Sequence, residues 1–189
     1  MQTKKHMKKL LILVLSCISL MRFNAYSCEK HLAQQLVNIA KEKKLTITTA
    51  ESCTGGMVSS AITAIPGSSS VFGYGFITYA NESKETLLDV KHRTLEKYGA
   101  VSEETAREMA LGALKNSGAE LAIAVTGVAG PSGGSAEKPV GLVYIAIATK
   151  DEVQVVKNNF SGDRNEIRLA TTKKALELSI DVLERKINK

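Results

Sequence analysis

Residues 121–130 read Leu-Ala-Ile-Ala-Val-Thr-Gly-Val-Ala-Gly, an apolar run that ends in a threonine and closely spaced glycines. The apolar part, 121–125, is typical of a strand that is buried on both faces of a sheet. A second long apolar run covers 140–149. These two runs are expected to be the central strands of the fold, and the glycine-rich stretch is expected to follow one of them as a loop.

The rest of the chain alternates between strand-like and helix-like segments. β-Branched and aromatic residues or partial alternation predict further strands at 45–49, 71–79 and 153–160. Apolar residues at helical spacing, glycine entries and a serine cap followed by acids predict helices at 29–43, 54–65, 82–88, 93–98, 103–115 and 163–186. This order predicts an α/β fold, a three-layer α/β/α single domain with a mixed sheet.

Charge is distributed unevenly along the chain. The net charge of the 189 residues is +6, but residues 1–28 hold five basic residues and no acidic one. The remaining 20 basic and 19 acidic residues leave a net charge of +1. Aromatic residues are few and tryptophan is absent. The body of the chain is therefore expected to bind neither nucleic acid nor a membrane surface.

The N-terminal residues have the three parts of a secretory signal peptide. A basic cluster at 4–9 precedes a mostly apolar run at 10–21, and Ala25-Tyr26-Ser27 places small residues ahead of Cys28. The apolar run is too short to span a bilayer. The alternative is a mis-called start or an uncleaved extension, with the true start at Met7 or Met21. We therefore expect residues 1–28 to be a leader or extension and 29–189 to form the domain.

The junction between the strand at 45–49 and the following helix gathers candidate nucleophiles. Ser52, Cys53 and Thr54 are followed by Gly55 and a second glycine. The first N–H groups of a helix lack internal partners and suit an anion, either a phosphate or a developing oxyanion. The alternative interpretation is that Ser52 or Thr54 only caps the helix. Cys53 is the one cysteine of the body, and no metal-ligand spacing is present.

Tyr79 and Lys84 follow the strand predicted at 71–79. A lysine can act as a base toward a serine only if burial or nearby positive charge lowers its pKa. Each residue also has an ordinary interpretation, strand packing for Tyr79 and a solvated helix position for Lys84.

The stretch 126–134 looks like a phosphate loop but departs from the known patterns. No Gly-Lys-Ser/Thr follows it, so the Walker A pattern is absent, and it is not a Gly-x-Gly-x-x-Gly fingerprint. Dense glycines let backbone N–H groups approach a ligand, although a flexible connection has the same composition. Arg164 can clamp a phosphate or carboxylate, or pair with Asp163 or Glu166 on the surface.

Taken together, these stretches resemble the CinA C-terminal-like family, the nicotinamide-nucleotide amidases. The similarity extends from about Leu32 to about Leu183. Six motifs carry it in order: Thr-Ala-Glu-Ser-Cys-Thr-Gly-Gly (49–56), Gly-Phe-Ile-Thr-Tyr-Ala-Asn-Glu-Ser-Lys (75–84), Gly-Ala-Val-Ser (99–102), Thr-Gly-Val-Ala-Gly-Pro-Ser-Gly-Gly (126–134), Lys-Pro-Val-Gly (138–141) and Phe-Ser-Gly-Asp-Arg (160–164). Each motif is weak alone, whereas the ordered set is specific.

The resemblance implies hydrolysis of the carboxamide of nicotinamide mononucleotide to nicotinic acid mononucleotide and ammonia, in NAD recycling. It implies a homo-oligomer that needs no metal or cofactor, in the stand-alone form without the molybdopterin-binding-like domain and its pyrophosphatase activity. The family's serine, lysine and tyrosine match Ser52, Lys84 and Tyr79. Its binding positions match Gly67, Thr126 and Arg164. We add Cys53, Thr54, Gly55, Gly127 and Gly130 as substrate-binding candidates.

The mechanism expected from these residues begins with attack by Ser52 on the amide carbon, with neutral Lys84 as the base. Tyr79 would orient the lysine or donate to the intermediate, and N–H groups near 53–56 would hold the oxyanion. Cys53 is the rival nucleophile. Because nicotinamide mononucleotide is mainly cytosolic, the expected location is cytoplasmic, or exported if residues 1–27 act as a signal peptide. The alternatives are a nucleotide-binding or competence-related interaction protein without turnover and a secreted hydrolase of another amide.

Overall fold

The apolar run at 121–125 lies in the middle of the sheet. The computed structural model describes residues 28–185, so the predicted leader, apart from Cys28, lies outside the described residues. The sheet has the order β2-β1-β3-β4-β5. β1, β2 and β3 are mutually parallel, whereas β4 and β5 each run antiparallel to the preceding strand. The strands are β1 (Ile47–Glu51), β2 (Phe72–Ile77), β3 (Leu121–Gly127), β4 (Leu142–Thr149) and β5 (Val153–Asn159). The predicted mixed sheet is confirmed.

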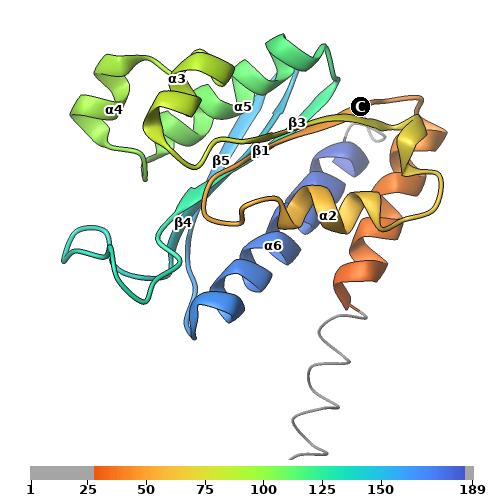
Figure 1. Ribbon diagram of the computed structural model, residues 1–189. Coiled ribbons are helices and arrows are strands. Elements are labelled where there is room, and N and C mark those ends of the chain that lie inside the picture. Colours follow the sequence, from red (N-terminus) through yellow and green to blue (C-terminus); the bar gives the residue numbers. More distant parts are fainter. Residues whose placement is uncertain (1–27, 186–189) are drawn as a thin grey trace, which may run out of the picture.

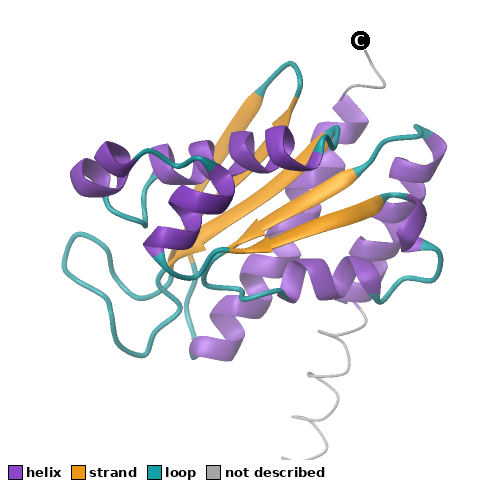
Figure 2. Ribbon diagram, turned by 45° about the horizontal axis from the view of Figure 1, so that its top comes forward, coloured by secondary structure: helices purple, strands orange, loops and turns teal. Residues whose placement is uncertain are grey.

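Helices cover both faces of this sheet and complete the three layers (Figures 1 and 2). One face packs against the N-terminal helical residues 28–42, α2 (Met57–Thr63) and α6 (Arg164–Arg185). The other face is covered by α3 (Asn81–Leu88), α4 (His92–Tyr98) and α5 (Glu103–Ser117). None of the helices within residues 28–185 combines the length and the apolar character that a bilayer crossing requires.

Residue size differs between the two faces of the central strands. On the α6 side, β3 presents Ile123 and Val125 and β4 presents Ile145 and Ile147, all buried. On the α5 side the buried hydrophobic residues of the same strands are alanines: Ala122, Ala124, Ala146 and Ala148. Successive side chains of a strand point to opposite faces, so the alternation of large and small residues in the sequence sets this difference.

Two predicted boundaries near residue 52 are wrong. The first strand is Ile47–Glu51 rather than 45–49, and the next helix begins at Met57 rather than at residue 54. Gly55 and Gly56 have φ values of +58° and +98°, which an α-helix cannot contain. Residues 52–56 therefore form a turn instead of a helical start. The strand extends to Glu51 because this residue still pairs with Ile77 of β2 and Val125 of β3.

The three parallel strands end at one edge of the sheet, as the carboxyl ends of parallel strands must. β1 ends at Glu51, β2 at Ile77 and β3 at Gly127. The segments that follow carry the three motifs with candidate nucleophile, candidate base and glycine-rich loop. The fold thus brings together stretches that are far apart in the sequence.

Candidate active site

A cavity of about 260 Å³ opens at this edge of the sheet. Its size approaches the roughly 300–1,000 Å³ of small-molecule sites. It is lined by Ser52, Cys53, Tyr79, Lys84, Ala100, Val101, Thr126, Gly127, Val128, Ala129, Gly130, Ser132, Gly133 and Arg164. All three predicted catalytic residues occur in this lining. Of the predicted binding residues, the lining includes Cys53, Thr126, Gly127, Gly130 and Arg164.

The strand register brings Ser52 and Lys84 together. The Ser52 N–H donates to the Val125 carbonyl of β3 at 3.0 Å, so the backbone at this candidate nucleophile continues the sheet. The Thr78 N–H donates to the Glu51 carbonyl at 2.8 Å and ties the end of β2 to the end of β1. With both ends fixed, Lys84 on α3 places its Nζ 3.3 Å from Ser52 Oγ.

The amine of Lys84 is held by carbonyl oxygens. Its Nζ donates to the Thr78 carbonyl at 2.7 Å and lies 3.4 Å from the Tyr79 carbonyl. Carbonyl oxygens only accept hydrogen bonds, so both contacts use N–H groups of the amine. A neutral amine has two such N–H groups and one lone pair. When both N–H groups are engaged, the lone pair is the group left to accept the Ser52 hydroxyl proton.

Burial favours the neutral form of this amine. Lys84 is only 1% exposed, and no carboxylate of the described residues lies within ion-pair distance of its Nζ. Desolvation lowers the pKa of Lys84 from its ordinary value, while the charges of Cys53 and Glu82 oppose this shift. The sequence-based condition for a lysine base, a pKa lowered by burial, is therefore met.

Burial has the opposite consequence for the neighbouring thiol. Cys53 is 4% exposed and packs among the core residues of the α6 side of the sheet. Desolvation raises its pKa to about 11. A thiol with this pKa is protonated at neutral pH, and the thiolate is the reactive form of cysteine. The geometry therefore favours Ser52 over Cys53 as the nucleophile.

The start of α2 does not offer a free anion site, contrary to the interpretation from the sequence. The Glu51 carboxylate, fully buried, accepts the N–H groups of Gly56, Val58 and Ser59 at 2.8–3.1 Å and the Ser59 hydroxyl at 2.6 Å. The chain's own carboxylate thus takes the place that a phosphate would have at a helix start. Any oxyanion must be held by the turn that precedes α2.

Two N–H groups of that turn are available. The Gly55 N–H donates to the Ser52 carbonyl at 3.0 Å. Within residues 28–185, the Thr54 N–H donates to no backbone or side-chain acceptor, and the Cys53 N–H contacts only the thiol of its own residue. The N–H of the residue after a nucleophilic serine is a common oxyanion donor. The Thr54 hydroxyl is buried and lacks a hydrogen-bond partner among the described residues, and the same holds for the hydroxyl of Thr78 beside Lys84.

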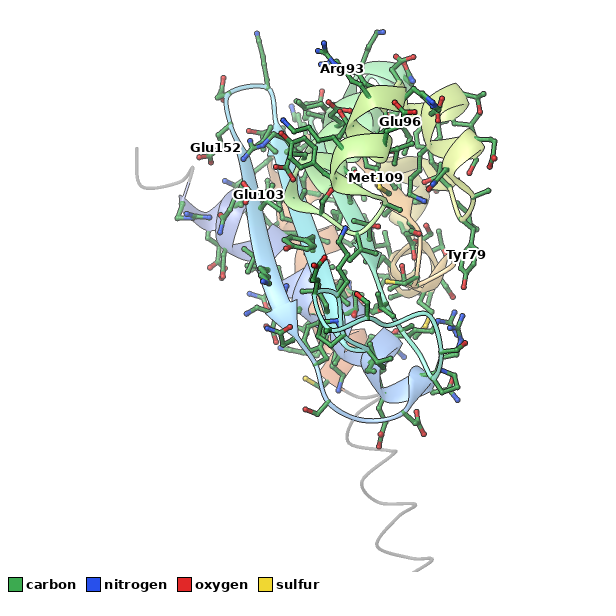
Figure 3. The ribbon with its side chains drawn as sticks, turned by 90° about the vertical axis from the view of Figure 1, so that its left-hand side faces the viewer. Tyr79, Arg93, Glu96, Glu103, Met109 and Glu152 are labelled. Atoms are coloured by element: carbon green, nitrogen blue, oxygen red, sulfur yellow. The ribbon has the colours of Figure 1, made fainter. Side chains whose placement is uncertain are left out.

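Tyr79 and Arg164 meet at the mouth of the cavity. The Tyr79 side chain is 59% exposed and lies at the edge of the molecule (Figure 3). Arg164 donates to the Tyr79 hydroxyl at 2.9 Å and to the Gly130 carbonyl at 2.8 Å. The phenol therefore contacts the arginine rather than Lys84, whereas the Tyr79 backbone carbonyl contacts the lysine. Neither Asp163 nor Glu166 forms an ion pair with Arg164.

The remaining predicted residues differ in their positions. Thr126, at the end of β3, is buried and donates its hydroxyl to the Ala100 carbonyl at 2.7 Å. Gly127 has no room for a side chain, because a Cβ there would lie 2.7 Å from the Leu142 carbonyl oxygen. Gly67 precedes β2, at the opposite end of the strand from the cavity, and is absent from the cavity lining. Within one chain, Gly67 is therefore not brought to the other candidates.

Two residues at the site were missed from the sequence. Glu51 holds the start of α2, and Arg168 on α6 donates to the Cys53 carbonyl at 3.1 Å and to the Thr54 carbonyl at 2.7 Å. The strand was expected to end at residue 49, so nothing in the sequence indicated that Glu51 is buried within it, where a carboxylate seldom lies without partners. No signal identified Arg168, which is one of several charged residues on a long helix. Within the described residues, no cluster of His, Cys, Asp or Glu side chains could hold a metal ion.

Comparisons with known proteins agree on one family. Residues 29–183 match the CinA C-terminal domain family. A putative competence-damage inducible protein of Caldicellulosiruptor bescii is 50% identical over 163 residues, which is 86% of this chain and 39% of that protein. A protein with the same description from Clostridioides difficile is 53% identical over 155 residues, 82% of this chain and 37% of that protein. The chain thus spans about two fifths of the length of these curated relatives.

Solved structures of similar length have the same fold. The competence/damage inducible protein CihA of Agrobacterium tumefaciens is 46% identical with a TM-score of 0.81, and the match covers 83% of this chain and 96% of that one. A CinA superfamily protein of Klebsiella pneumoniae is 30% identical with a TM-score of 0.81, covering 83% and 98%. The match of the family over most of the chain, together with these identities, leads to one conclusion: the chain belongs to the CinA C-terminal domain family.

Proposed function

We propose that this protein is an amidase that hydrolyses the carboxamide of nicotinamide mononucleotide by a serine–lysine mechanism. The observation that carries the proposal is the buried amine of Lys84. It lies 3.3 Å from Ser52 Oγ, its N–H groups have carbonyl acceptors, and desolvation lowers its pKa. A serine next to such an amine can be activated without a histidine.

The proposed reaction has two halves. Ser52 Oγ attacks the carboxamide carbon while its proton moves to Lys84 Nζ. The N–H groups of Cys53 and Thr54 stabilise the resulting oxyanion. Lys84 then protonates the leaving nitrogen, ammonia departs, and an acyl ester with Ser52 remains. In the second half, water attacks the ester with Lys84 as the base, and nicotinic acid mononucleotide leaves with the Ser52 hydroxyl restored.

The cavity supports a substrate with an apolar ring and an anionic group. Ala100, Val101 and Val128 supply apolar surface in the same cavity as the Ser52 hydroxyl. Arg164 and the glycine-rich loop that follows β3 lie at its mouth. A guanidinium and closely approaching backbone N–H groups suit a phosphate. The aromatic amide would lie toward Ser52, with the ribose phosphate toward Arg164.

The test is ammonia release from nicotinamide mononucleotide by the full chain and by Ser52→Ala. Release by the parent and loss in the variant supports the amidase. Nicotinamide, which lacks the ribose phosphate, serves as the comparison substrate and should be hydrolysed poorly. Binding of the nucleotide in calorimetry without ammonia release from a folded parent would reject the proposal and favour a nucleotide-binding protein without turnover.

A further inference from the structure

Arg168 contacts the turn of residues 52–56, called the nucleophile turn below, although more than a hundred residues separate them in the sequence. It lies on α6, and its guanidinium donates through Nε to the Cys53 carbonyl and through Nη2 to the Thr54 carbonyl. No carboxylate of the described residues lies within ion-pair distance of it. A planar guanidinium that spans two successive carbonyls fixes both peptide planes, which a single point charge cannot do.

Fixing a carbonyl also fixes an N–H group. In a trans peptide unit the C=O and the following N–H lie in one plane and point in opposite directions. The Cys53 carbonyl shares its peptide unit with the Thr54 N–H, so Arg168 sets the direction of that N–H. The hydrogen bond also polarises the unit and strengthens the donor on its far side.

The second contact reaches the other candidate donor through one more peptide unit. The Thr54 carbonyl shares its unit with the Gly55 N–H, which donates to the Ser52 carbonyl at 3.0 Å. The Ser52 carbonyl in turn shares its unit with the Cys53 N–H. One guanidinium therefore determines the orientation of both N–H groups of the turn that have no backbone acceptor within the described residues.

Glu51 holds the other end of the same turn. Its carboxylate accepts the N–H groups of Gly56 and Val58 at 2.9 and 3.1 Å. Gly55 and Gly56 are flexible residues with positive φ values, so the turn needs external contacts to keep one conformation. The carboxylate fixes the side of the turn that leads into α2, and Arg168 fixes the side that follows Ser52.

We propose that Arg168 is a positioning residue, which orients the N–H groups of Cys53 and Thr54 as the oxyanion donors of the hydrolysis. This role rests on the proposed amidase function. Arg168 itself does not touch the substrate. It acts through the backbone, so its loss is expected to slow the chemical step without weakening substrate binding.

The experiment compares Arg168→Met and Arg168→Lys with the full-length parent. The matched control is Arg107→Met, because Arg107 is also half-buried and donates to a backbone carbonyl, that of Val153, away from the cavity. Arg168→Met should lower kcat by about 10- to 100-fold with KM changed by less than about threefold, as for misplaced oxyanion donors. Arg168→Lys should recover part of the loss, and Arg107→Met should keep the parent kcat.

A second readout does not depend on the substrate assignment. A fluorophosphonate reacts with an activated serine hydroxyl and contains no nicotinamide. Its rate of reaction with Ser52 should fall in Arg168→Met, with Ser52→Ala as the background. Equal kcat and equal labelling rate in parent and Arg168→Met would overturn the positioning role. If Arg168→Met does not fold, an unchanged kcat in Arg168→Lys overturns it.

The two readouts separate the two proposals. A parent that releases no ammonia but is labelled at Ser52, more slowly in Arg168→Met, refutes the substrate and supports the positioning role. A parent that releases ammonia as fast as Arg168→Met refutes the positioning role alone. A folded parent with neither ammonia release nor labelling refutes both.

Discussion

Replacing Lys84 with methionine tests whether the amine is buried without a compensating charge. Its pKa in the folded chain is lowered by desolvation, whereas a lysine in the unfolded chain titrates near 10.4. Between these two pKa values the unfolded chain binds more protons than the folded chain. The free energy of unfolding of the parent therefore rises with pH across this window, by at most about 1.4 kcal/mol per pH unit for one proton. Methionine does not titrate, so the variant lacks this rise.

The size of the difference at neutral pH comes from opposing contributions. Methionine removes the cost of burying the ammonium group, but it leaves the Thr78 and Tyr79 carbonyls without their donor. A buried polar group left unpaired costs about 1–3 kcal/mol. Because these contributions partly cancel, the change in stability at one pH says little. The informative quantity is how the difference in unfolding free energy between parent and Lys84→Met changes with pH.

Urea unfolding of the parent and Lys84→Met from about pH 6 to about pH 10 gives this quantity, since the linear extrapolation yields a free energy at each pH. The stability of the parent relative to the variant should increase with pH. Lys150→Met is the control, because Lys150 is exposed and its charge stays in water in both states. A difference between parent and Lys84→Met that stays constant with pH would refute the reasoning, since it would mean that folding does not change the proton affinity of Lys84.

Three further outcomes are expected. Ser52→Ala should lower kcat by at least about 10³-fold with a small change in KM, while Cys53→Ala should keep most of the activity. The reverse pattern in steady-state kinetics would identify the thiol as the nucleophile. The kcat/KM of the parent should rise with pH and level off below the ordinary lysine pKa, because the neutral amine of Lys84 is the proposed base. A pH profile without this rise contradicts that role. Gly112→Ala should destabilise the protein by at least about 2 kcal/mol in urea unfolding, because the added Cβ would overlap the Leu88 carbonyl oxygen between α5 and α3. A change under about 0.5 kcal/mol would show that this contact is looser than described.

Most of the fold could be predicted from local sequence patterns. The apolar run at 121–125 and the helical spacing of apolar residues are strong periodic signals. The start of the helix at 103–115 was predicted from Ser102, and in the structure the Ser102 hydroxyl oxygen accepts the Thr105 N–H at 3.2 Å. The start of the helix expected at 54–65 was misplaced because apolar spacing says nothing about positive φ values. Only the paired glycines indicated a turn, and paired glycines also occur at helix starts.

The site was predictable only where its residues follow strand ends. Ser52, Lys84 and Thr126 come together because parallel strands end at one edge, which the order of the segments implies. The direction of a side chain is not encoded in this way. Tyr79 contacts Lys84 through its backbone carbonyl and Arg164 through its hydroxyl, and the sequence could not separate these two contacts. Arg168 was missed because its carbonyl partners lie more than a hundred residues earlier in the chain.

One helix, α6, supplies both arginines of the cavity region. Arg164 and Arg168 lie one helical turn apart at the start of α6, whereas Ser52 and Lys84 come from the first half of the chain. A ribosome-bound chain that has not yet released α6 therefore carries the serine and the lysine but neither the contact that fixes the nucleophile turn nor the group at the mouth of the cavity. The order of synthesis thus delivers the serine and the lysine before the two arginines that complete the turn and the mouth of the cavity.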